Sequence, residues 1–176
     1  MNQNKYPTLV EIKNNKKELI EKGEDMLREL NDVRITLEKM RKNEENNLDV
    51  ITKLEEKEGY LSTELLKLDL GIKILDVIES IIENNIFGDY WKIIEKKIPY
   101  DKLLEIVAKN GLNIKKVCLE LYKIANIDDQ NIVNKIQNLP DEECQNIYEN
   151  PQLNKYLDKI ISRIKKLKKL TNNNII

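Results

Sequence analysis

The sequence predicts an all-α fold, in which a long amino-terminal coiled-coil helix, or a helical hairpin, precedes a compact bundle of about five short helices. Three observations carry this prediction. Apolar residues recur at coiled-coil spacing, glycine and proline occur only five and four times in 176 residues, and helix-ending signals gather from Gly88 onward. Charged residues make up 35% of the chain, above the roughly 25% of an average domain, as long solvated helix faces require.

The first helix is predicted to begin at Thr8. Thr8 and Glu11 fit the capping box, in which the hydroxyl accepts from an early backbone N–H and the carboxylate reaches back to the cap. Residues 1–7 are predicted to be a disordered arm. No proline occurs between Pro7 and Pro99, so a long helix meets no obstacle.

Apolar residues then follow the 3-4 spacing of a coiled-coil seam. With Leu9 as position a, ten of the eleven d positions through Ile82 are apolar, and six of the eleven a positions are. Because the register never slips, residues 8–64 are assigned to a coiled-coil arm. Its predicted seam consists of Leu19, Met26, Leu30, Val33, Leu37, Met40, Ile51, Leu54, Leu61 and Leu65.

The apolar stripe is broader than a two-stranded zipper needs, since Ile20, Leu27 and Leu48 occupy e positions. A hairpin or a bundle of three or more helices suits this breadth better than a parallel dimer does. The register also leaves the oligomer number open.

Two consecutive seam positions near the middle of the arm, Glu44 and Asn47, are polar. A turn there would produce two antiparallel helices, about 8–42 and 48–86. No glycine or proline marks a loop at this point, and asparagine is frequent throughout the chain. We therefore favour one continuous helix and keep the hairpin as the alternative.

From Leu65 to Ile82 the predicted helix becomes apolar on several sides, which indicates packing on several sides. Residues 65–170 are therefore assigned to a helical domain, and 171–176 to a disordered tail. Breaks at Gly88, Pro99 and Gly111 divide this domain into short helices.

The residues that carry most catalytic chemistry are missing or scattered. The chain has no histidine, which excludes Ser-His-Asp and Cys-His nucleophile systems and His-containing zinc sites. The five glycines are too far apart for a phosphate-cradling loop, and Cys118 and Cys144 form no Cys-x-x-Cys motif. Acidic pairs such as Asp128 and Asp129 suit helix N-termini. We predict no catalytic residue, metal or cofactor; an enzyme built on carboxylates and lysines is a minor alternative.

The last predicted helix is strongly basic, with seven bases and one acid between Lys155 and Lys169. It also carries an apolar stripe that includes Leu157, Ile160 and Ile164. We favour packing of this stripe on the core with solvated lysines; the alternatives are contact with nucleic acid, an anionic membrane or a helical protein. The candidate phosphate contacts are Lys159, Arg163, Lys165, Lys166, Lys168 and Lys169.

These features predict a non-enzymatic interaction protein, a scaffold or adaptor that binds itself or another helical protein through the coil. The alternative is a nucleic-acid-binding protein that dimerises through the coil and contacts phosphates with the basic C-terminal helix. The net charge of −1 provides no overall attraction to nucleic acid, so this alternative is not favoured.

Composition also bears on location. No stretch has the about 20 nearly uncharged residues of a membrane span, and the polar start of the chain lacks a signal-peptide core. We therefore expect a soluble, cytoplasmic protein with free thiols. Asn, Ile and Lys supply 22, 25 and 26 residues, a bias that indicates an AT-rich genome.

Overall fold

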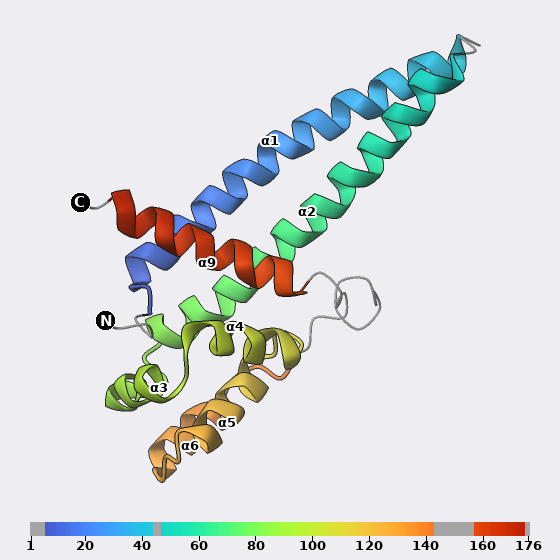
Figure 1. Cartoon of the computed structure of the whole chain (residues 1–176). Helices are drawn as coiled ribbons and strands as arrows, with labels where there is room; N and C mark the ends of the chain where they lie inside the picture. The colour runs from blue at the N-terminus through green and yellow to red at the C-terminus, as the bar shows by residue number, and fades with distance from the viewer. Residues whose placement is uncertain (1–5, 44–46, 143–156, 175–176) are drawn as a thin grey trace.

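The computed structural model describes residues 6–43, 47–142 and 157–174, with side chains described up to residue 167 in the last range. Within these ranges the chain forms seven α-helices and one 3₁₀ segment, which confirms the all-α prediction (Figure 1). Two long helices come first, α1 (Leu9–Lys42) and α2 (Leu48–Glu83). The later elements are the 3₁₀ segment Gly88–Tyr90, α3 (Trp91–Lys97), α4 (Tyr100–Lys109), α5 (Ile114–Ile124), α6 (Gln130–Gln137) and α9 (Leu157–Asn174).

The two long helices pack against each other as an antiparallel hairpin. The prediction of one continuous helix through residues 43–47 is therefore wrong, and the alternative hairpin is confirmed. Figure 1 shows the hairpin extending away from the short helices, with the end of α1 and the start of α2 at its far end. α1 begins at the predicted capping box, where the Glu11 backbone N–H donates to the Thr8 hydroxyl at 3.2 Å.

Asparagine provides the caps on both sides of the reversal. The backbone N–H of Asn43 donates to the carbonyl of Lys39 at 3.1 Å and closes α1. The side-chain oxygen of Asn47 accepts from the backbone N–H of Val50 at 3.4 Å and opens α2. Bases fill the last turn of α1 and Asp49 lies in the first turn of α2, as the two helix dipoles favour.

The predicted seam lies between the two helices of the hairpin. Leu30, Val33 and Leu37 of α1 pack with Leu61 of α2 in a small apolar cluster. Leu19 joins the main core instead, and Met40 is half-buried near the tip. The stripe is therefore covered within one chain. The remaining seam residues pack against the small cluster and are partly buried: Met26, Ile51, Leu54 and Leu65.

Ion pairs link the two helices along the flanks of the seam. Glu29 and Lys57 lie 2.8 Å apart, Arg41 and Glu55 2.9 Å apart, and all four side chains are about half exposed. Such pairs contribute no more than about 1 kcal/mol each. They reinforce the antiparallel register, whereas burial of the seam provides the stabilisation.

The main core surrounds the second half of α2, which is buried on several sides as predicted. Leu68, Ile74, Leu75 and Ile78 of α2 belong to this core together with buried residues of α4, α5 and α9. α1 also contributes to it, through Ile12 and Leu19 among others. The division between an arm at 8–64 and a domain at 65–170 stays a prediction, and α2 runs unbroken across it.

The chain is ordered further towards both ends than predicted. Tyr6 is buried; its hydroxyl donates to the Ile98 carbonyl at 2.6 Å, and its ring contacts Trp91 and Tyr100. The predicted disorder is therefore wrong at this residue, because an aromatic ring buries a large apolar area. Residues 1–5 and 175–176 lie outside the described residues. α9 continues to Asn174, past the predicted tail boundary at residue 170.

Replacing Leu61 with Asp should destabilise the hairpin far more than replacing Glu58 with Ala. Leu61 is 3% exposed, so the variant buries an unpaired carboxylate, which costs several kcal/mol. Glu58 makes only a 3.4 Å ion pair with the half-exposed Arg34, worth less than about 1 kcal/mol. Thermal unfolding followed by circular dichroism measures both changes. Equal losses in melting temperature would contradict this packing of the seam.

Candidate functional site

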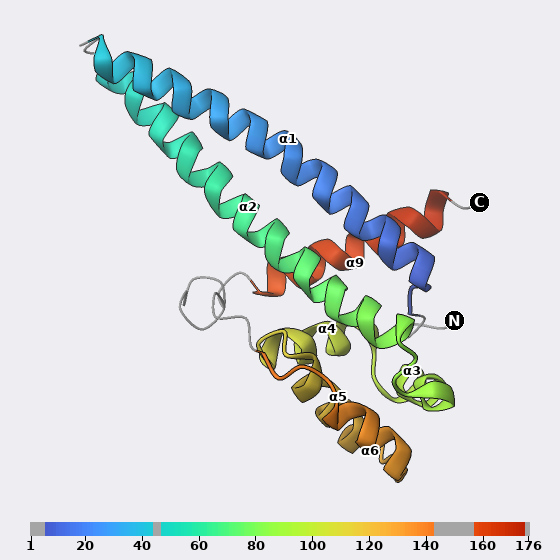
Figure 2. The ribbon, with the colours of Figure 1, turned by 180° about the vertical axis from the view of Figure 1, so that it is seen from behind.

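α9 crosses the base of the hairpin and packs against both α1 and α2 (Figures 1 and 2). Its stripe is buried through Ile160, Ile161 and Ile164, which confirms the favoured packing of this helix on the core. The three helices meet at Gly71 of α2. A Cβ atom there would lie 3.6 Å from Leu19 and 3.7 Å from Ile160, at ordinary van der Waals distance.

The heptad register explains which side of the hairpin α9 covers. In an antiparallel pair, the e positions of both helices lie on one side of the seam and the g positions on the other. Gly71, which contacts α9, occupies a g position, as do Glu64 and Lys22. α9 therefore covers the g side at the base of the hairpin.

A buried ion-pair network holds α9 against α2. The carboxylate of Glu64 accepts from Arg163 of α9 at 2.7 Å and from Lys67 at 3.0 Å. The side chains of Glu64 and Lys67 are each 9% exposed. Desolvation alone would raise the pKa of Glu64, but the hydrogen bonds from Arg163 and Lys67 outweigh it and lower that pKa below its ordinary value.

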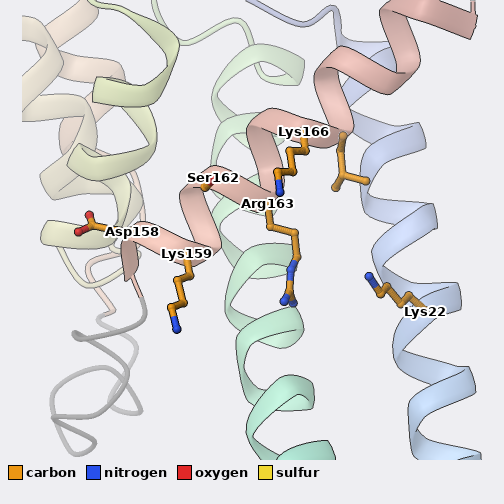
Figure 3. A pocket seen from close by; sticks show the side chains of 7 residues that line it. Lys22, Asp158, Lys159, Ser162, Arg163 and Lys166 are labelled. Carbon is orange, nitrogen blue, oxygen red and sulfur yellow. The ribbon is translucent and has the colours of Figure 1, made fainter.

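A groove of about 570 Å³ opens beside this network, between α1 and α9. Figure 3 shows side chains projecting into it from α9, with Lys22 approaching from α1. Its rim therefore combines residues from opposite ends of the sequence. The lining residues are Lys22, Asp158, Lys159, Ser162, Arg163, Lys166 and Leu167.

The structure brings some of the predicted phosphate contacts together and separates others. Lys159, Arg163 and Lys166 line the groove. Lys165 instead pairs with Asp101 of α4 at 3.4 Å. The side chains of Lys168 and Lys169 lie outside the described residues.

Lys22 is the one cation of the groove that was not among the candidate phosphate contacts. It is one of many lysines on a long helix, and nothing in the local sequence separates it from the others. Lys22 occupies a g position, next to the seam. This position would have indicated contact with α9 only if α9 had been known to cover the g side. The fold alone brings it opposite α9.

The groove is suited to holding an anion through ammonium and guanidinium groups. Among the described residues, no group of three or more His, Cys, Asp or Glu is placed to hold a metal ion. In the same part of the chain, no helix combines the length and apolar character needed to cross a membrane.

A second surface lies on the opposite, e side of the hairpin. Ile20 and Leu27 occupy successive e positions of α1 and are 42% and 48% exposed. Gly23 lies between them, and a Cβ atom placed there would meet no atom within 4 Å. The extra breadth of the apolar stripe noted in the sequence therefore remains open to solvent at this point.

Replacing Glu64 with Gln should loosen α9 and reduce the dependence of stability on pH. The folded-state pKa of Glu64 lies below its unfolded value of about 4.3, so its stabilisation is complete above that pH and is lost as pH falls through the folded-state pKa. We expect the variant to lose about 2 kcal/mol of unfolding free energy at neutral pH. The deficit should shrink in acid.

Urea unfolding across this pH range measures the difference, with the exposed Glu56→Gln as a charge-matched control. The control should unfold like the parent chain at every pH. A deficit for Glu64→Gln that is the same at neutral and acid pH would contradict the proposed role of its ionised carboxylate.

Comparison with known proteins identifies a relative of nearly the same length. The chain is 61% identical over 173 residues to an uncharacterized protein, MJ0948, of Methanocaldococcus jannaschii. The match covers 98% of this chain and 91% of the relative. No family model and no solved structure matches the chain. The chain therefore belongs to the same family as the Methanocaldococcus jannaschii protein.

Proposed function

We propose that the chain is a non-enzymatic interaction protein that associates with a second copy of itself along the open e side of the hairpin. The supporting observation is the exposure of Ile20 and Leu27 beside a seam that is otherwise covered. Self-association was first expected through the a and d positions. The hairpin packs most of the apolar residues at those positions within one chain, so the proposed contact moves to the e positions.

The arrangement of these residues suits a two-fold contact. Ile20 and Leu27 are one heptad apart. If two α1 helices pack antiparallel, Ile20 of each copy lies opposite Leu27 of the other, which forms two equivalent contacts. Gly23 lies near the centre of that contact, where the absence of a side chain permits close approach of two backbones. A helix of another protein is the other occupant that this face would accept.

The nucleic-acid alternative has less support. Lys165, one of the candidate phosphate contacts, pairs with Asp101 of α4 instead of joining the cations of the groove. A location in the cytoplasm also remains a proposal. It is supported by the buried, free thiol of Cys118, which suits a reducing compartment.

The full chain should have twice the mass of one copy in light scattering at concentrations of tens of micromolar. Replacing both Ile20 and Leu27 with Asp should return it to the mass of one copy, because charges would face each other across the contact. Ile35→Asp is the matched control, since Ile35 is 51% exposed on the same helix at an f position, facing away from the seam. A monomeric parent chain, or an equal effect of the control, would contradict the proposal.

A further inference from the structure

We propose that the groove between α1 and α9 binds a compact ligand carrying two or more linked phosphate groups, such as a polyphosphate or the phosphate chain of a nucleotide. Lys22, Arg163 and Lys166 would contact the phosphates, and Lys159 and Ser162 line the same groove. This site uses different residues from the self-association surface. Its test is therefore independent of the proposed function.

The first argument is the convergence of positive charge from two distant elements. Four of the seven lining residues are cations and one, Asp158, is an acid. Figure 3 shows Asp158 directed away from Lys22, Arg163 and Lys166. Cations brought close together repel one another, and an anion between them relieves this repulsion.

The second argument is that one cation of the groove is held in place. Arg163 is fixed by its 2.7 Å hydrogen bond to Glu64, whose carboxylate is itself held by Lys67. Positioned donors bind anions better than freely rotating ones, because less side-chain entropy is lost on binding. The Ser162 hydroxyl adds a neutral donor to the same groove.

The third argument concerns size. Lys159, Arg163 and Lys166 are spaced i, i+4 and i+7, so they lie on one face of α9 over about 10 Å. Lys22 faces them from α1 across the groove. The volume of about 570 Å³ lies within the range of small-molecule sites.

A compact ligand fits this charge distribution better than a nucleic acid does. On the α4 side of α9, a neighbouring hollow is lined by three acids, Asp101, Glu105 and Asp158, beside Lys165 and Lys166, and Asp101 pairs with Lys165. Among the described residues, the basic side chains of α9 therefore do not continue onto α4 as a positive track. A protein that binds duplex DNA tightly makes about 6–10 phosphate contacts along such a track.

Isothermal titration calorimetry on the full chain tests the proposal, with tripolyphosphate, ATP and inorganic phosphate as probes. We expect one saturable site for tripolyphosphate and ATP, and at least about tenfold weaker binding of inorganic phosphate. Lys22→Gln and Lys166→Gln should each weaken tripolyphosphate binding about tenfold. Lys17→Gln and Lys165→Gln remove the same charge outside this groove and should change the affinity by less than about twofold.

Circular dichroism establishes that each variant keeps the fold of the parent chain. No saturable binding of tripolyphosphate up to about 1 mM would overturn the proposal. An equal loss of affinity in Lys165→Gln and Lys166→Gln would also overturn it, because binding would then follow total charge. Tighter binding of a random oligonucleotide than of tripolyphosphate, weakened by the same two variants, would assign the groove to nucleic acid instead.

Discussion

A helix of more than thirty residues with an apolar stripe along its length can bury that stripe only against a helix of similar length. In this chain the partner is supplied by the reversal at residues 43–47, which brings Leu30 and Leu37 of α1 onto Leu61 of α2. A connection this short costs little loop-closure entropy, whereas a second chain must be captured from solution. The later packing depends on this pairing, because α9 contacts both helices and the core includes Ile12 of α1.

The antiparallel pairing also separates the surface of the hairpin into two chemically different sides. The g side at the base receives α9, which lies next to Gly71 and is held by the bond between Glu64 and Arg163. The desolvation of such a buried pair offsets much of its attraction, so the pair adds little net stability. Any other position of α9 would leave Glu64 without Arg163, so the network specifies where α9 lies. The groove follows from that placement, since Lys22 lies opposite α9 only when α9 crosses at this level.

The sequence was sufficient for the class of fold and for the start of α1 at Thr8, because these depend on periodicity and local capping. The reversal was kept only as the alternative to a continuous helix because asparagine had been discounted as compositional background, although Asn43 and Asn47 cap the two helices there. Tyr6 and Lys22 could not be placed from sequence. Their contacts with Ile98 and with α9 join segments that only the tertiary fold brings together.

The two candidate surfaces meet on one short segment of α1. Ile20 and Leu27 face the e side, while Lys22 lies between them in the sequence and faces the g side. Because one helix carries both sets of side chains, the contact of α9 with α1 fixes the orientation of the e side together with that of Lys22. The substitutions on the two sides remain separable, because Ile20 and Leu27 are not among the residues that line the groove. Any effect of an anion bound in the groove on self-association would therefore have to pass through the backbone of α1. That effect would disappear if α1 were free to rotate against α9.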